Sequence, residues 1–397
     1  MGDASPWAVF LVFLKLGLTS FGGPIAHLGF FRTEFVERRR WLDEEHYADI
    51  VALSQFLPGP ASSKVGIIVG TLRAGIPGAL AAWLGFTAPS ALALILFGYG
   101  VAALGDLGHA PWLHGLKIVA VAVVAQAVWG MAKNLCPDRP RLTIAAAATV
   151  LVLAMPSTLG QVGVIVLGGL AGWRLLPAET VALNPLPVRL GRGWSVASIV
   201  LFFALLIGLP LAVSATGNHW LAVFDAFYRS GALVFGGGHV VLPLLQAATV
   251  PPGWIGNDAF LAGYGAAQAV PGPLFTFAAY LGTVMGPQPN GWQGGLFCLL
   301  GIFLPSFFLA LGPLPFWNWF RRHPALRAML KGVNAAVVGL LLAALYTPVW
   351  TGAIHAPLDF AIAAVALLLL VTWKVPPWLV VVVGALAMQT ATVLASL

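Results

Sequence analysis

The chain has 397 residues, of which 59% are hydrophobic and only 8% are charged, and its formal net charge is +7. A soluble domain carries about a quarter charged residues, so this composition excludes a sizeable soluble domain. Apolar runs of about twenty residues recur along the chain, and each is long enough to cross a bilayer. The sequence therefore predicts an all-α, multi-pass membrane protein in a lipid bilayer. The surplus positive charge lies in short loops, where it indicates orientation in the membrane and gives no reason to expect a nucleic-acid partner.

The first apolar run, from Trp7 to Leu18, contains Lys15 and lacks a small-residue cleavage site. These features predict a retained membrane helix rather than a signal peptide. The motif Phe21-Gly22-Gly23 follows, and we expect its glycines to end the helix and to let another backbone approach closely. Close packing between helices is the alternative, because glycine is also common at membrane helix interfaces.

The next segment has the pattern of a broken helix. Residues Tyr47 to Leu57 are predicted to be helical, with Asp43 as the N-cap. Pro58-Gly59-Pro60 then interrupts the helix, because proline lacks a backbone N–H and glycine permits unusual dihedral angles. A second short helix is predicted from Ala61 to Leu72. Each piece is too short to cross a membrane, and broken backbone at that depth is tolerated only where it is buried in protein or lines a wet cavity.

The start of that second helix is a candidate anion site. Its free N–H groups and positive dipole end favour negative charge. Ser62, Ser63 and Lys64 add donors in the first turn, and Gln55 precedes the break. The alternative is a kinked helix that serves only for packing. A single copy would favour that alternative, whereas a second copy favours a functional site.

A second copy does occur, about 214 residues later. It predicts an N-terminal repeat over residues 1–177, a linker with an unmatched apolar helix (about Ser195 to Ser214) over 178–219, and a C-terminal repeat over 220–397. The second copy has no equivalent of Lys64, so we do not expect identical sites in the two halves. The repeated elements are Arg229 for Lys15, Phe235-Gly236-Gly237 for residues 21–23, Gln268 for Gln55, Pro271-Gly272-Pro273 for residues 58–60, and Thr276 for Ser63.

Equivalent loops of the two halves differ in charge. Residues 32–40 hold four arginines and 133–141 hold three basic residues, whereas their counterparts 246–257 and 347–357 hold none. Basic loops stay on the cytoplasmic side, so the two halves are predicted to insert upside down relative to each other. We expect about 10–13 membrane segments in total. The number of crossings fits the predicted orientations if each Pro-Gly-Pro segment is a re-entrant hairpin and one helix near the junction does not fully cross, and other combinations also fit.

The two cations inside apolar helices point to a path for anions between the halves, because membrane helices rarely contain a buried charge. Arg229 has Asp225 one turn earlier, and this pair would neutralise it. Lys15 has no carboxylate at the equivalent spacings. It is therefore expected to be the principal charge for anion binding, unless it extends to the membrane surface from a helix end.

Several kinds of chemistry have no sequence support. There is no phosphate-binding loop of the Walker type, no His-Glu-x-x-His motif and no pair of intramembrane carboxylates suited to catalysis. Cys136 and Cys298 give neither a disulfide framework nor metal-ligand spacing. We therefore expect no enzymatic activity, no metal and no cofactor. A membrane-embedded enzyme that acts on a lipid remains the alternative from another class.

The paired Phe-Gly-Gly motifs, the Gln-x-x-Pro-Gly-Pro segments and the duplicated helical layout resemble the chromate ion transporter family in its long, two-domain form. The resemblance covers nearly the whole chain. It implies export of chromate, a tetrahedral oxyanion, across the bacterial inner membrane, and hence resistance to chromate. A carrier of sulfate or of another oxyanion is the alternative within transport, and a homodimer is left open.

The candidate substrate-binding residues are Lys15, Phe21, Gly22, Gly23, Gln55, Pro58, Gly59, Pro60, Ser62, Ser63, Lys64, Arg229, Phe235, Gly236, Gly237, Gln268, Pro271, Gly272, Pro273 and Thr276.

Overall fold

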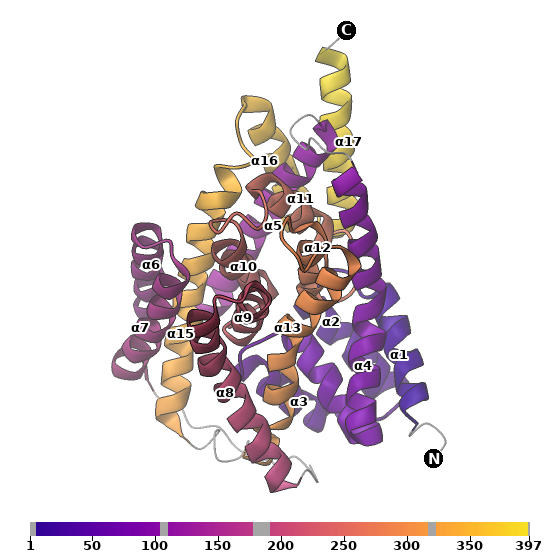
Figure 1. Cartoon of the computed structure of the whole chain (residues 1–397), viewed down its shortest axis with the longest axis vertical. Coiled ribbons are helices and arrows are strands. Elements are labelled where there is room, and N and C mark those ends of the chain that lie inside the picture. The colour runs from indigo at the N-terminus through magenta and orange to yellow at the C-terminus, as the bar shows by residue number, and fades with distance from the viewer. Residues whose placement is uncertain (1–4, 104–109, 178–190, 317–322, 396–397) are drawn as a thin grey trace.

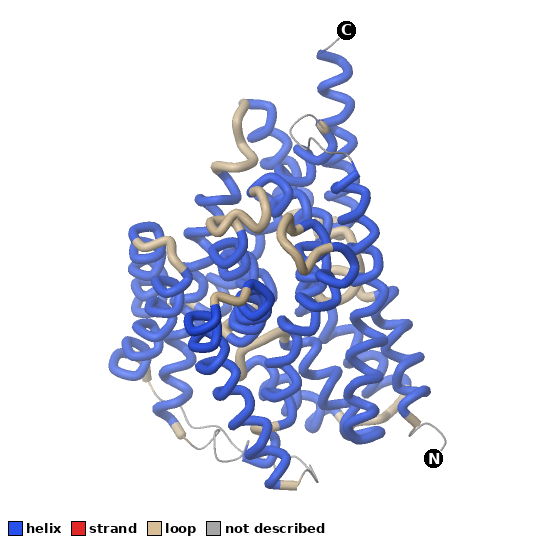
Figure 2. Tube along the Cα trace, in the orientation of Figure 1, coloured by secondary structure: helices blue, strands red, loops and turns tan. Residues whose placement is uncertain are grey.

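The computed structural model describes residues 5–103, 110–177, 191–316 and 323–395. Over these ranges every regular element is helical, as predicted (Figures 1 and 2). The elements are α1 (Pro6–Thr19), α2 (Gly23–Arg32), η1 (Thr33–Arg38), α3 (Glu44–Phe56), α4 (Ala61–Ala103), α5 (Pro111–Leu135), α6 (Arg139–Ala154), α7 (Thr158–Leu175), α8 (Arg192–Thr216), α9 (His219–Ala232), η3 (Gly238–Val240), α10 (Val241–Thr249), α11 (Asn257–Ala267), η4 (Leu274–Thr276), α12 (Phe277–Val284), α13 (Gly291–Leu311), η5 (Leu314–Phe316), α15 (Pro324–Ala344), η6 (Leu345–Trp350), α16 (Pro357–Val371) and α17 (Pro377–Ala395).

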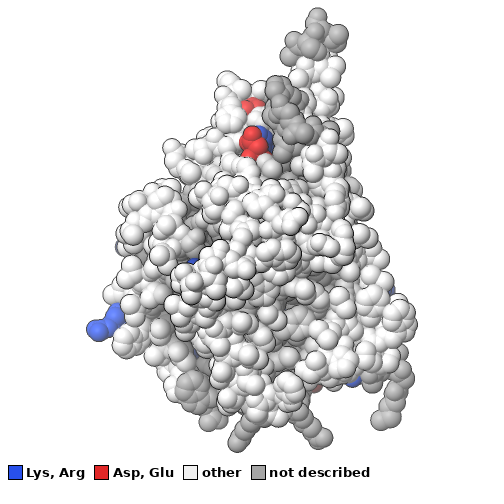
Figure 3. Space-filling model, in the orientation of Figure 1, with Lys and Arg blue, Asp and Glu red and all other residues white. Residues whose placement is uncertain are grey.

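The outer surface is that of a membrane protein. Seven of the described helical segments are long and apolar enough to cross a bilayer, and three more apolar helices of 10–17 residues are shorter. Large apolar side chains point outward, such as Leu96 on α4 and Leu211 on α8, each more than half exposed. Most of the face in Figure 3 is uncharged. A surface of this kind is unfavourable in water and suits contact with lipid. The chain is therefore a multi-pass membrane protein.

The first Pro-Gly-Pro segment is the tip of a re-entrant hairpin. Helix α3 begins where the Asp43 carboxylate accepts the His46 N–H at 2.8 Å, and it ends at Phe56. Residues 58–60 turn the chain, and the first part of α4 leads out again. The Arg73 guanidinium at its far end lies 4.8 Å from the centre of the Trp41 ring, just before α3. Both ends of this hairpin (hairpin 1, residues 44–73) thus lie together.

Helix α4 contains a reversal that the sequence analysis did not find. Ala74 (φ −142°, ψ 27°) and Gly75 (φ 63°, ψ −153°) leave the helical region. A Cβ atom on Gly70 would collide with the Gly78 carbonyl, and residues eight apart in a straight helix lie about 12 Å apart. Residues 61–73 and 76–103 are therefore two helices packed side by side. The short helix predicted from Ala61 to Leu72 is the first of them.

The second Pro-Gly-Pro segment is the tip of a matching hairpin. Helix α11 leads in, residues 271–273 turn the chain, and η4 with α12 leads out (hairpin 2, residues 257–284). The Gly286 N–H donates to the Trp254 carbonyl at 3.0 Å, so the two ends of this hairpin also lie together. Gly282 then packs closely against Gly294 on α13, as Gly70 packs against Gly78. Both Pro-Gly-Pro segments interrupt a helix, as predicted.

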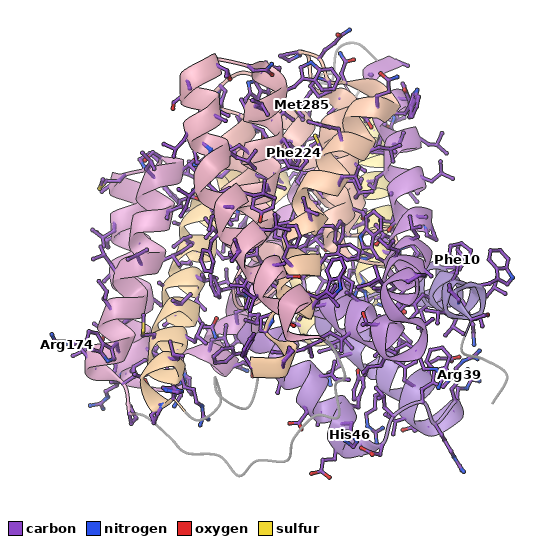
Figure 4. All side chains as sticks on the ribbon, turned by 60° about the horizontal axis from the view of Figure 1, so that its bottom comes forward. Phe10, Arg39, His46, Arg174, Phe224 and Met285 are labelled. Carbon is purple, nitrogen blue, oxygen red and sulfur yellow. The ribbon has the colours of Figure 1, made fainter. Side chains whose placement is uncertain are left out.

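The two hairpins enter from opposite ends of the molecule. Figure 4 shows His46, at the start of hairpin 1, at the lower end beside Arg39, and Met285, after hairpin 2, at the upper end. Arg174, at the end of α7, also lies toward the lower end in this view. The hairpin tips therefore approach the middle of the molecule from two sides.

Helices from the two halves of the sequence are exchanged in the packing. Helix α5 packs against α16 and α17, whereas α15 packs against α6 and α7. Glycines permit these close contacts: Gly115 touches Gly384, and Gly172 touches Gly332. The unmatched apolar helix is α8, which packs against α9 and α13. The predicted linker falls largely on residues 178–190, outside the described residues, and the predicted repeat boundaries stay a prediction.

The opposite entry of the hairpins gives a topology prediction. Cys136 and Cys298 are both buried, so replacing them by alanine leaves a background without reactive thiols. We expect Glu45→Cys, in the exposed first turn of α3, and Gln288→Cys, in the exposed loop after α12, to react with a membrane-impermeant maleimide from opposite sides of the membrane. The measurement is labelling of intact cells against inverted vesicles. Labelling of both positions from the same side would show that the arrangement is wrong.

Candidate functional site

Each hairpin tip is hydrogen-bonded to the end of a helix from the other half. The Gly59 N–H donates to the Val234 carbonyl, just after α9, at 2.6 Å. We call this contact and the side chains around it crossing 1. The Gly272 N–H donates to the Ser20 carbonyl, just after α1, at 2.9 Å. We call this contact and the side chains around it crossing 2. Val234 and Ser20 directly precede the two Phe-Gly-Gly motifs. The structure therefore brings together two pairs of motifs that are far apart in the sequence.

The two tips leave no room for a side chain. Gly59 has φ +100° and Gly272 has φ +92°, values that L-residues rarely adopt. A Cβ atom on Gly59 would lie 3.2 Å from Ser306 Oγ, and one on Gly272 would lie 2.9 Å from Ser90 Oγ and 3.0 Å from the Phe86 carbonyl. Glycine is therefore favoured at both tips by the backbone conformation, and the close approach of the Phe86 backbone adds a stricter requirement at Gly272.

Crossing 1 contains a buried lysine, Lys64. This side chain is fully buried, and its Nζ donates to the Leu57 carbonyl at 2.5 Å and the Pro58 carbonyl at 2.8 Å. These carbonyls end α3, where the negative end of the helix dipole lies. An ammonium group has three donors, so one N–H remains beyond these two bonds. Lys64 thus fixes the tip of hairpin 1 and still offers charge and a donor.

Polar groups with open hydrogen-bonding capacity surround crossing 1. His27 Nδ1 lies 3.3 Å from Ser62 Oγ, and His27 Nε2 has no partner among the described residues. The buried hydroxyls of Ser63 and Ser306 also lack partners among them. Buried polar groups without partners are costly, so such a set favours binding of a polar ligand or water.

Crossing 2 has similar geometry but different chemistry. Thr276 Oγ1 donates to the Pro273 carbonyl at 2.8 Å, and Ser90 Oγ donates to the Thr87 carbonyl at 3.1 Å. Gln268 Nε2 and Ser20 Oγ have no partner among the described residues. Neutral donors therefore occupy the region where crossing 1 has Lys64, as the missing lysine in the second copy predicted.

The Phe-Gly-Gly motifs end α1 and α9. Gly22 has φ +100° and Gly236 has φ +75°, so a glycine in the left-handed region follows the end of each helix, as expected. The expected close approach of another backbone does not occur, because the atoms nearest to a Cβ on Gly22 or Gly236 belong to side chains and nothing lies within 4 Å of a Cβ on Gly23. The Phe21 ring lies 6.0 Å from that of Trp378 on α17. Gly236 packs against Leu135 and Met131 on α5. Phe235 and Gly237 are partly buried beside it, and the motifs anchor the crossings to helices of the other half.

Lys15 is not the buried cation that was expected in this apolar helix. Its side chain is 53% exposed, and its Nζ lies 3.6 Å from Glu34 Oε2 on η1. Glu34 also accepts from Arg39 at 2.7 Å. Burial alone would raise the pKa of Glu34, but the Arg39 hydrogen bond and the charge of Lys15 hold it below its usual range. The counter-charge comes from a residue nineteen positions later, which a search at helical spacing could not find.

Arg229, the equivalent of Lys15, is mostly buried and paired within its own helix. Its guanidinium donates to Asp225 Oδ2, as the i,i+4 spacing indicated. The pair faces a cavity of about 220 Å³ beside crossing 1. Arg229 is therefore close to the crossing without being part of it.

Comparison with known proteins agrees with this duplicated arrangement. The family model described as "Chromate transporter" matches residues 7–173 and again residues 221–389. The chain belongs to the chromate transporter family. Among curated relatives, the chromate transport protein of Pseudomonas aeruginosa is 29% identical over 381 residues, covering 92% of this chain and 87% of the relative. The probable chromate transport protein of Synechococcus elongatus is 26% identical over 390 residues, covering 94% and 93%. No solved structure matches the chain.

Membership of this family makes the chain a transporter and not an enzyme. The described residues contain no group of three or more His, Cys, Asp or Glu side chains placed to hold a metal ion. Both cysteines are buried, and they do not form a disulfide bond with each other.

The structure changes the set of candidate residues that the sequence analysis gave in two ways. Gln55 is exposed on α3, whereas its counterpart Gln268 reaches the interior, so the two glutamines are not equivalent in the fold. Ser90 and Ser306, which lie against the hairpin tips, were not among the candidates. The repeated Pro-Ser pairs at residues 89–90 and 305–306 were the signal that could have identified them.

Proposed function

We propose that this chain carries chromate, or the similar tetrahedral dianion sulfate, across the membrane, and that crossing 1 is its binding site. The observation that carries the proposal is Lys64, a fully buried lysine at a helix break whose Nζ donates to two carbonyls and which, in its ammonium form, has one further donor. Such a group is unfavourable in a membrane protein unless it has a function. The names of the two relatives given above include the word chromate, and chromate is proposed as the substrate of this chain on that basis.

The charge requirement of a dianion supports the same site. A dianion that enters a low-dielectric site loses a large hydration energy, which fixed positive charge and N–H donors must offset. A helix N-terminus supplies about half a unit of charge. The start of α4 at Ala61 and the Lys64 ammonium together supply about one and a half units, of which the negative end of α3 offsets about half a unit, and Ser63 adds a hydroxyl donor. Crossing 1 therefore offers more compensation than crossing 2.

We infer further that the two halves are inverted repeats. Helix α5 begins near the start of α11, where Lys117 Nζ lies 3.0 Å from Asp258 Oδ1. The segment after α15 ends near the same place, where Gly352 packs against Asn257. The equivalent helices α5 and α15 therefore run in opposite directions, as inverted repeats require. Alternating access in such proteins arises when one repeat rocks against the other around a shared site.

Export is the direction of transport that we propose, and the orientation of the chain indicates which end faces the cytoplasm. The end that contains Arg39 and Arg174 is the more basic one and is assigned to the cytoplasm by the positive-inside rule. In a bacterial plasma membrane, export of chromate from that side would give resistance. Sulfate is the second candidate substrate, because Lys64 and hydroxyl donors recognise charge and tetrahedral oxygens rather than the central atom.

Reconstitution of the purified chain in liposomes tests this function. We expect transport of radiolabelled chromate and of radiolabelled sulfate above the level of empty liposomes, with each anion inhibiting the other, because both would use crossing 1. Chromate transport that excess sulfate does not inhibit would restrict the substrate to chromate. Absence of transport of either anion, by protein shown to be folded, would overturn the proposal.

A further inference from the structure

A second polar site lies next to crossing 1, on an adjacent face of α9. It is the cavity of about 220 Å³ between α7, α8, α9 and α10. Asp225, Arg229 and Ser230 of α9 and Thr158 of α7 supply its polar lining, and Trp254 forms part of its otherwise mainly apolar wall. One water occupies about 30 Å³ in the liquid, so the cavity has room for a small anion together with water.

The charged pair in this cavity is only half satisfied. Asp225 is 6% exposed, and its Oδ2 accepts from Arg229. Asp225 Oδ1 and Arg229 Nε are both buried and have no hydrogen-bond partner among the described residues. A buried charge pair is stabilised only when its remaining donors and acceptors are also satisfied. The open acceptor and donor therefore point to a ligand that the pair can share.

The cavity adjoins the proposed transport site through α9. Ser230 and Leu233 line the cavity. Their neighbours Gly231 and Val234 belong to crossing 1: the Gly231 carbonyl lies 3.6 Å from the position of a Cβ on Gly59, and Val234 accepts the Gly59 N–H. The two sites therefore lie on adjacent faces of the end of α9 and the residues that follow it. An anion at crossing 1 has Arg229 as a nearby buried cation on this helix.

We propose that this cavity is a second oxyanion-binding site, in which the anion replaces Asp225 as the partner of Arg229 while Asp225 takes up one proton. The inference rests on the proposed function, because it needs an oxyanion to be the cargo. The proton comes from water and binds the Asp225 carboxylate. The resulting carboxylic acid carries an O–H that donates to the anion, whereas the carboxylate could only repel it. Anion binding and proton binding therefore favour each other equally.

The surroundings contain few other groups that could take this proton. Among the described residues that line the cavity, Asp225 and Arg229 are the charged ones, and α7, α8 and α10 contribute neutral side chains. The nearest other titratable ring, His219, packs edge-on against Trp254 with 5.1 Å between ring centres. In the first half the equivalent cation, Lys15, is exposed and pairs with Glu34. That pair provides a matched control at the same repeat position.

Equilibrium binding of radiolabelled sulfate to the purified full-length chain tests the inference between about pH 5 and pH 8. Sulfate stays a dianion over this range, so its own titration does not contribute. We expect wild-type affinity to rise as the pH falls, by up to about tenfold per pH unit for one linked proton. Asp225→Asn, which is neutral at every pH, should bind sulfate more tightly at high pH and change by less than about twofold over the range.

Three further variants separate this site from its surroundings. Arg229→Gln should lose the pH-dependent component, whereas Arg229→Lys keeps the charge and should retain it in weaker form. Glu34→Gln should keep the wild-type pH slope. If Asp225→Asn also keeps that slope while the wild type binds sulfate, the inference is overturned and the proposed function stands. If the folded wild type binds neither sulfate nor chromate at any pH, the proposed function and the inference both fail.

Discussion

Gly272→Ala is expected to abolish chromate transport while the protein still inserts in the membrane. The left-handed conformation at Gly272 (φ +92°) costs an L-residue about 1–2 kcal/mol. The new Cβ would in addition lie 2.9 Å from Ser90 Oγ and 3.0 Å from the Phe86 carbonyl. Since the Phe86 contact is with backbone, the tip of hairpin 2 must move and its hydrogen bond to Ser20 must lengthen. We expect transport in liposomes to fall at least about tenfold, which corresponds to about 1.4 kcal/mol.

Two other glycines separate the cause of this loss. Gly217 at the end of α8 also has a positive φ (+61°), but a Cβ there would meet nothing within 4 Å. Gly217→Ala therefore carries backbone strain without a collision, and we expect nearly normal transport. Gly59→Ala should lie between the two, because its closest contact is 3.2 Å from the Ser306 hydroxyl, which can rotate. Equal transport by Gly272→Ala and Gly217→Ala would show that close approach at the tip is not needed.

Lys64→Met is expected to weaken chromate and sulfate binding by at least about tenfold. A hydrogen bond to a charged group contributes about 1.5–3 kcal/mol, and the substitution removes the donor proposed for the anion. It also leaves the Leu57 and Pro58 carbonyls without their ammonium partner. Methionine has a similar length and an apolar end, so the volume of the site is largely kept. The measurement is equilibrium binding of each radiolabelled anion at equal amounts of purified protein.

Lys15→Gln is the matched control for charge. Lys15 is also a lysine near a helix break, but it is 53% exposed and pairs with Glu34, so we expect less than about twofold change in binding. Ser63→Ala removes only one hydroxyl at crossing 1 and serves if Lys64→Met fails to accumulate. We expect it to weaken binding with little change in thermal stability. Normal binding by both Lys64→Met and Ser63→Ala would remove crossing 1 from the proposed mechanism, and a larger effect of Lys15→Gln would restore Lys15 as the principal charge.

Local features of the sequence determined the helices and their breaks. Asp43 caps α3 and residues 58–60 end it because capping and proline act on neighbouring backbone groups only. The same holds for the second tip, which the repeated motif located. The apolar runs indicated membrane helices because a stretch of about twenty such residues is suited to crossing a bilayer. Lys64 could be placed in the first turn of α4 for the same local reason.

Only the tertiary structure decided which of these elements meet. Glu34 reaches Lys15 from another helix, and the Gly59 and Gly272 tips bond to Val234 and Ser20 across the two halves. The reversal at residues 74–75 likewise depends on the Gly70 and Gly78 backbones packing against each other, which gives no periodic signal. Such contacts join residues far apart in the chain, and their energy depends on shape and distance in the folded protein. A single sequence carries their components, but the folded chain is needed to bring them together.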